Sequence, residues 1–329
     1  MSTTVRRTVF TRLAHRTIAA PALVLDHCTR RMQTLAFEEI KVSPEKPHRY
    51  TALILHGLLG SGRNWRSFSR SLAASLAPAQ WRMVLVDLRN HGKSAELDGF
   101  LPPHNLENAA KDLANLVRSQ GWDWPDIVVG HSMGGKVALQ FAQSCANGDY
   151  GDIDGLPKQL WVLDTVPGQG SRENSDGEVE KVLRTLQSLP STVPSRKWLV
   201  DHMLQLGFSN SLSQWIGSNL KTSGKEVTWA FNIEGAVQMF HSLGEMDYWP
   251  LLENTPKGME IAIVRAEKSD RWDADVIKQL NNLSSKRSDE TEGKFSVHVL
   301  PNSGHWVHVD NAKGLLEIVA PKVASLGLC

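Results

Sequence analysis

The residues best suited to chemistry surround Ser132, in the run Gly130-His131-Ser132-Met133-Gly134. The run follows the apolar residues 127–129 and precedes a helical pattern at 136–141, as expected for a Gly-x-Ser-x-Gly motif between a strand and a helix. Its glycines permit a very tight turn that lifts the serine hydroxyl above the edge of a sheet. The N-terminus of the following helix favours negative charge near that hydroxyl. We therefore predict that Ser132 is a nucleophile.

A serine hydroxyl is a weak nucleophile and needs a base within hydrogen-bond reach. His305 lies in a loop directly after the last expected strand, residues 295–300. Catalytic groups of open α/β sheets gather at the carboxyl ends of the strands, where this loop belongs. We predict that His305 is the general base, and we interpret His308 as a structural or surface residue.

An acyl-transfer site also needs two backbone N–H donors for the developing oxyanion. One is expected from the residue after the nucleophile, Met133, and the other from the loop after the strand at 51–55. That loop reads His56-Gly57-Leu58-Leu59-Gly60-Ser61, which makes Leu58 the second expected donor.

These residues require a sheet whose strands end at one edge. The apolar runs are mostly continuous rather than alternating, which is typical of parallel strands covered by helices on both faces. We therefore predict an α/β fold with a mostly parallel central sheet flanked by helices. The expected strands are residues 35–42, 51–55, 82–86, 126–129, 160–163, 260–264 and 295–300, and the expected helices are 65–76, 105–119, 135–146, 274–283 and 312–324.

The interval 166–252 breaks this alternation, because it contains helical patterns and no clear strand. We interpret it as an inserted helical cap. The α/β core is then formed by residues 38–165 and 253–329.

The first 37 residues are rich in arginine and hydroxylated residues and contain one acid, Asp26. This composition predicts an organelle-targeting leader, with the mitochondrion favoured over the chloroplast. Translation from Met32 would delete the leader and leave a cytoplasmic protein.

The net charge of +1 provides no broad basic surface, so we expect no nucleic-acid partner. No apolar stretch approaches the ~20 residues that span a bilayer. The three cysteines are not spaced as a zinc site or a disulfide framework, and we expect no metal.

Four runs carry a family resemblance: His56-Gly57-Leu58-Leu59-Gly60-Ser61, Asp87-Leu88-Arg89-Asn90-His91-Gly92-Lys93-Ser94, Gly130-His131-Ser132-Met133-Gly134-Gly135-Lys136 and Gly304-His305-Trp306-Val307-His308. From about residue 53 to the C-terminus, the chain resembles the abhydrolase domain-containing protein 11 branch of the α/β-hydrolases, which includes the bacterial esterase YbfF. The resemblance implies a cofactor-free esterase or lipase-like hydrolase, mitochondrial in animals, with the α/β-hydrolase fold.

The acid of the site has two candidates. Most α/β-hydrolases place it after the strand that corresponds to 260–264, where Asp270 stands in a turn without the usual glycine. The bacterial members of the resembled branch use an aspartate after the preceding strand, and Asp164 occupies that place. We favour Asp164 and expect its carboxylate to lie within ~2.6–3.2 Å of His305 Nδ1, whereas Asp270 should not.

The sequence thus predicts a serine hydrolase that cleaves an ester-type bond, carboxylester, lipid or thioester, in a small acyl substrate through Ser132, His305 and Asp164. The alternative is a ligand receptor or partner-stabilising protein that keeps the scaffold with vestigial turnover or none.

Overall fold

The computed structural model describes residues 34–151, 155–169, 176–224, 226–286 and 293–326. Residues 1–33, which make up most of the predicted leader, lie outside these ranges. Targeting of the chain to an organelle therefore stays a prediction.

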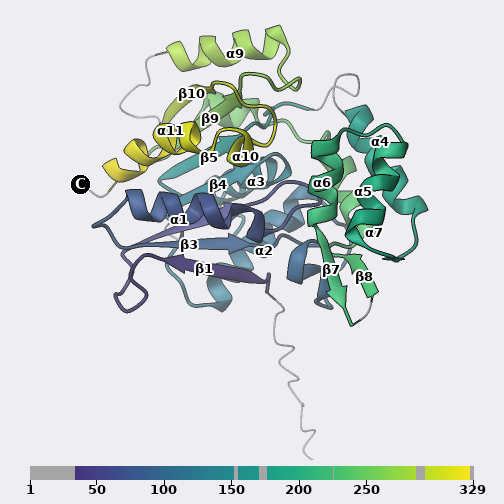
Figure 1. The fold of residues 1–329 in the computed structure, drawn as a ribbon. Coiled ribbons are helices and arrows are strands. Elements are labelled where there is room, and N and C mark those ends of the chain that lie inside the picture. Colours follow the sequence, from purple (N-terminus) through teal and green to yellow (C-terminus); the bar gives the residue numbers. More distant parts are fainter. Residues whose placement is uncertain (1–33, 152–154, 170–175, 225, 287–292, 327–329) are drawn as a thin grey trace, which may run out of the picture. The chain divides into compact units, whose positions relative to one another are not determined.

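A seven-stranded sheet forms the centre of the described chain, in the order β1-β3-β2-β4-β5-β9-β10 (Figure 1). Only the edge strand β1 pairs antiparallel, so the predicted mostly parallel sheet is confirmed. Each of the seven predicted strands is present. Their bounds are β1 Phe37–Lys41, β2 Tyr50–Leu55, β3 Trp81–Val86, β4 Ile127–His131, β5 Gln159–Leu163, β9 Glu260–Ala266 and β10 Lys294–Leu300.

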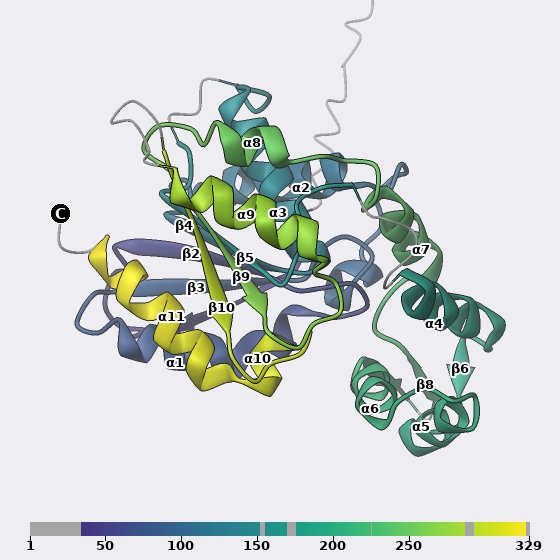
Figure 2. The ribbon, with the colours of Figure 1, turned by 90° about the horizontal axis from the view of Figure 1, so that it is seen from above.

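Helices cover both faces of this sheet (Figure 2). Helices α1 and α11 pack on one face, and α2, α3 and α9 on the other. Successive residues of β2 explain the continuous apolar runs, because Leu53 and Leu55 join one apolar cluster while Ala52 and Ile54 join the opposite one. The helices are α1 Arg66–Ser75, α2 Leu106–Ser119, α3 Met133–Ala146, α8 Trp249–Glu253, α9 Ala274–Ser285, α10 Val307–Asp310 and α11 Ala312–Ser325, with 3₁₀ turns at Gly62–Trp65 and Gly92–Glu96.

The insertion between β5 and β9 contains helices with an apolar core of their own, but it is not purely helical. A three-stranded antiparallel sheet, β6-β8-β7, corrects the expectation that this segment has no strand. These strands have two to four residues each, too few for a visible alternation. The cap elements are α4 Asp176–Ser188, β6 Thr192–Val193, α5 Arg196–Gln205, α6 Asn210–Ser218, β7 Leu220–Ser223, β8 Glu226–Trp229 and α7 Ile233–Ser242.

The end of the interval predicted as the cap packs against the core. Tyr248, Leu251 and Leu252, near the end of the interval 166–252, pack into the same apolar cluster as α2 and α3. Tyr248 also donates its hydroxyl hydrogen to Gln140 Oε1 on α3, at 2.9 Å. Apolar residues at helical spacing look alike in sequence whether they face a cap or a core.

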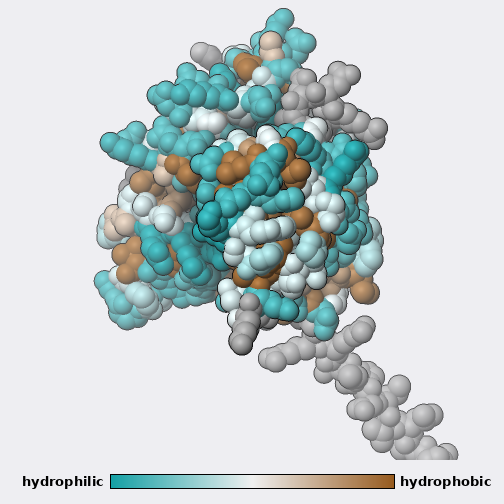
Figure 3. Space-filling view, turned by 45° about the vertical axis from the view of Figure 1, so that its right-hand side comes forward, coloured by the Kyte–Doolittle hydropathy of each residue, from teal (hydrophilic) through white to brown (hydrophobic). Residues whose placement is uncertain are grey.

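On the face drawn in Figure 3, hydrophobic residues form separate patches divided by hydrophilic ones. None of the helices described in the structure is both long and apolar enough to cross a membrane.

Candidate active site

Ser132 forms the turn between β4 and α3 with a backbone of φ 53° and ψ −120°. Positive φ is strained for a side-chain-bearing residue, and the surrounding glycines make it possible. A Cβ on Gly130 would lie 2.2 Å from the carbonyl oxygen of Gly134, and one on Gly135 would lie 2.2 Å from Thr165 Oγ1. The predicted tight turn is therefore present, and no larger residue fits beside it.

The imidazole of His305 meets the carboxylate of Asp164 across the ends of two strands. His305 Nδ1 lies 2.7 Å from Asp164 Oδ2, within the distance predicted from the sequence. Asp164 directly follows β5, is fully buried and has a φ of 45°. Asp270 is exposed and lines the same cavity. Both Asp270 and His305 are described in the structure, and no hydrogen bond joins them. The arrangement agrees with the choice of Asp164 over Asp270.

Both members of this pair have a lowered pKa. Burial raises the pKa of Asp164, but the hydrogen bond and charge of His305, with further donors, lower it by more. Burial lowers the pKa of His305, and the positive charge of Arg271 lowers it further against the opposing effect of Asp164. At neutral pH the imidazole is therefore neutral and the carboxylate ionised, the states that a general base and its orienting acid require.

Replacing Arg271 with glutamine is expected to move the acid limb of the kcat/KM profile to higher pH. A general base must be neutral, so activity falls as the pH decreases through the pKa of His305. Removing the nearby positive charge raises that pKa. The measurement is hydrolysis of an uncharged ester between about pH 5 and 8. Lys268→Gln, which removes an exposed charge from the same loop, is the control; equal acid limbs in the two variants would contradict this account.

The loop after β2 presents the predicted oxyanion donor Leu58 to the cavity. The next N–H along the chain, that of Leu59, donates to Nε2 of the buried His91 at 3.0 Å. His56 Nε2 accepts from Leu88 N–H, which ties the loop after β2 to the loop after β3. Burial lowers the pKa of His56 to about 4 and that of His91 to about 3, so both rings are neutral and can accept these hydrogen bonds.

The second predicted donor, Met133, is the first residue of α3. Its side chain is buried in the core, so any contact of Met133 with a ligand would be made by its backbone N–H. The first N–H groups of a helix have no partner within it, which suits them to an anion.

Two further residues support the loops of the site. The ring of His131 is buried, and its Nε2–H donates to the backbone oxygen of His305 at 2.8 Å, which fixes the loop that carries the imidazole. Asp87, directly after β3, accepts from Gly62 N–H and Lys93 N–H, which ties the loop after β2 to the loop after β3. Only the Gly-x-Ser-x-Gly position of His131 signalled proximity to the site.

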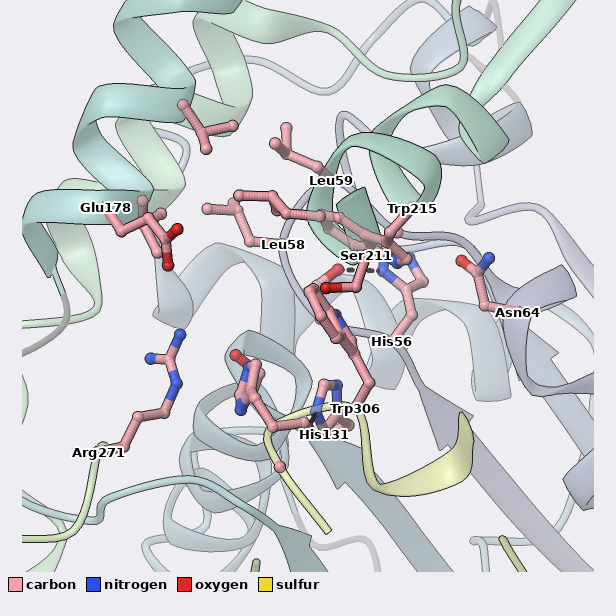
Figure 4. Close-up of a pocket in the computed structure, with 18 of the residues that line it drawn as sticks. His56, Leu58, Leu59, Asn64, His131, Glu178, Ser211, Trp215, Arg271 and Trp306 are labelled. Carbon is pink, nitrogen blue, oxygen red and sulfur yellow. Dashed lines mark hydrogen bonds between the residues drawn. The ribbon is translucent and has the colours of Figure 1, made fainter. Parts of the chain in front are cut away.

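Ser132 and His305 line a cavity of about 430 Å³. Figure 4 shows other residues of its wall, among them Leu58, Trp215 and Trp306. Its walls come from the loop after β2, the cap helices and the loops after β9 and β10. Figure 4 shows Arg271 extending toward Glu178 of α4 on the side of the cavity away from Asn64. The apolar lining residues include Leu58, Leu59, Val179, Val182, Leu212, Trp215, Phe240, Leu243 and Trp306.

No metal centre is formed by the described part of the chain, where no three histidine, cysteine, aspartate or glutamate side chains are grouped closely enough to hold an ion. The cavity lining includes the hydroxyl of Ser132 and the imidazole of His305, groups that suit acyl transfer.

Comparison with known proteins identifies the family of the chain. The model of the alpha/beta hydrolase family matches residues 52–318. The chain is 25% identical over 264 residues to sn-1-specific diacylglycerol lipase ABHD11 of Danio rerio, covering 78% of this chain and 73% of the relative. It is 26% identical over 312 residues to protein phosphatase methylesterase 1 of Homo sapiens, covering 82% and 74%. The solved structure of a marine microorganism esterase superposes with a TM-score of 0.67 at 23% identity, covering 88% and 98%.

The fold and the family model define the class of the protein: the chain belongs to the alpha/beta hydrolase family. Among its relatives it resembles ABHD11, as the sequence motifs predicted, and it is an enzyme of the serine hydrolase type.

Proposed function

We propose that this protein hydrolyses an ester-type bond of a small acyl substrate through a Ser132–His305–Asp164 triad. The observation that carries the proposal is the 2.7 Å contact between His305 Nδ1 and Asp164 Oδ2, at a cavity lined by both Ser132 and His305. A nucleophile, a base and an acid that orients the base are the parts of a catalytic triad, whatever their order in the chain.

In the first half-reaction, Ser132 Oγ forms a bond to the carbonyl carbon while His305 Nε2 takes the hydroxyl proton. The N–H groups of Leu58 and Met133 stabilise the negative oxygen of the tetrahedral intermediate. The bond to the leaving group then breaks, and His305 returns the proton to the departing alcohol. Asp164 holds the imidazole in the required tautomer and stabilises its charged form.

In the second half-reaction, water adds to the acyl carbon as His305 Nε2 takes one of its protons. The bond to Ser132 Oγ breaks, and Ser132 recovers its proton from His305. Neither half-reaction requires a cofactor.

The apolar cap wall supports a substrate with an apolar acyl or alkyl group, because such a group removes apolar surface from water when it binds. Two of the relatives are named as enzymes that cleave esters, a diacylglycerol lipase and a methylesterase. Their similarity supports the ester class without specifying the acyl group.

The test is a panel of p-nitrophenyl esters and matched thioesters with acyl chains of increasing length. The folded protein should turn over part of the panel, with kcat/KM rising from acetyl to longer chains until the cavity is filled. A folded protein that hydrolyses no ester or thioester in the panel would contradict the proposal.

A further inference from the structure

The loop after β9, residues 267–273, is the place where most members of this fold carry the triad acid. Here it supplies hydrogen-bond donors to Asp164 instead. Ser269 Oγ donates to Asp164 Oδ2 at 2.7 Å, and Trp272 Nε1–H donates to Asp164 Oδ1 at 2.6 Å. The backbone N–H of Ala266, the last residue of β9, donates to Oδ1 at 2.9 Å.

Together with the hydrogen bond from His305, these contacts fill the acceptor positions of the Asp164 carboxylate. Each oxygen of Asp164 accepts two hydrogen bonds: Oδ1 from Ala266 and Trp272, and Oδ2 from Ser269 and His305. An ionised carboxylate has about four lone-pair sites, so all of them are occupied. Because Asp164 is fully buried, losing a donor would leave part of a buried charge without compensation.

The same loop also holds the segment that bears the base. Glu267 N–H donates to the backbone oxygen of Leu300 at 3.0 Å, and Lys268 N–H donates to that of Ser303 at 2.8 Å. The loop 267–273 therefore holds Asp164 through side-chain hydrogen bonds, and it holds the loop that carries His305 through backbone hydrogen bonds.

We propose that Ser269 and Trp272 are positioning residues of the active site, which act on the reaction through Asp164. They hold the carboxylate plane so that Oδ2 faces His305 Nδ1, and they disperse its charge. Neither side chain is among the residues that line the cavity, whereas their loop neighbours Asp270 and Arg271 are. The inference rests on the triad of the proposed function and adds its supporting donors.

The test uses Ser269→Ala and Trp272→Phe in the full chain, singly and together, with kcat, KM and the acid limb measured on one uncharged ester. Each single variant is expected to lose roughly tenfold in kcat, the range for a hydrogen bond to a charged group, with KM unchanged. The acid limb should move to higher pH, because a less stabilised carboxylate attracts the proton of His305 more strongly. Ser269→Thr keeps the hydroxyl and should restore both readouts.

Trp161→Phe is the matched control, because it also removes a buried indole hydrogen bond, to Gln159 Oε1 at 3.1 Å, away from the cavity. Rates are divided by the concentration of active sites titrated with a fluorophosphonate. If the loss of rate disappears on this correction and the acid limb stays in place, the residues support folding alone and the proposal is overturned. Wild-type kcat in the double variant also overturns it. An active Asp164→Asn enzyme would instead overturn the acid of the proposed function.

Discussion

Replacing Ser132 with alanine is expected to lower kcat for ester hydrolysis by about 10⁶-fold, the order reached when the nucleophile of a triad is removed. In the proposed mechanism the hydroxyl oxygen of Ser132 is the atom that forms the acyl-enzyme. The other serines that line the cavity, Ser209 and Ser211, lie at the start of the cap helix α6. The variant should fold normally, since Ser132 is only partly buried and no core packing depends on its hydroxyl. The measurement is steady-state hydrolysis with circular dichroism of the same sample.

Ser119→Ala, at the exposed end of α2, is the control and should keep wild-type turnover. If Ser132→Ala hydrolyses esters at a rate close to that of Ser119→Ala, Ser132 is not the nucleophile.

Replacing Asp164 with asparagine is expected to lower turnover by about 10⁴-fold. An amide cannot accept the Nδ1–H of His305 with the strength of a carboxylate, and it favours the tautomer that cannot take the serine proton. Asp270→Asn is the matched variant: it removes a carboxylate from the same cavity, but one that acts on His305 only by charge. Its effect should be modest.

The two asparagine variants give opposite outcomes under the two assignments. Suppose that Asp270→Asn loses most of its turnover while Asp164→Asn keeps it, with both variants folded by circular dichroism. The triad acid would then be Asp270, at the position usual for the fold.

The core of the fold could be predicted from sequence because its signals are local. Val128 and Val129 belong to a run long enough to define a strand, and residues 135–146 and 312–324 repeat over several helical turns. Parallel strands buried on both faces then follow from the absence of alternation. The cap strands β6, β7 and β8 give no such signal, because two to four residues become a strand only through tertiary pairing.

The reactive groups of the site could be predicted for a related reason. Ser132 is marked by the glycines that its turn requires. Asp164 directly follows β5 and His305 lies in the loop after β10, so topology predicts that both lie at the same edge of the sheet. The choice of Asp164 over Asp270 came from the family resemblance. The supporting contacts depend on three-dimensional proximity. Trp272 lies 108 positions from Asp164, and nothing in its neighbourhood distinguishes an indole that donates to a carboxylate from one that only packs.

The most direct test of the central claim is labelling of the wild-type protein with a fluorophosphonate, followed by mass spectrometry of the modified peptide. An activated serine reacts covalently with this probe, whereas ordinary serines do not. The account predicts one adduct per chain, on Ser132, and its loss in Ser132→Ala. A folded protein that takes up no probe, or takes it up on another residue, would contradict the claim that Ser132 is the nucleophile of a serine hydrolase.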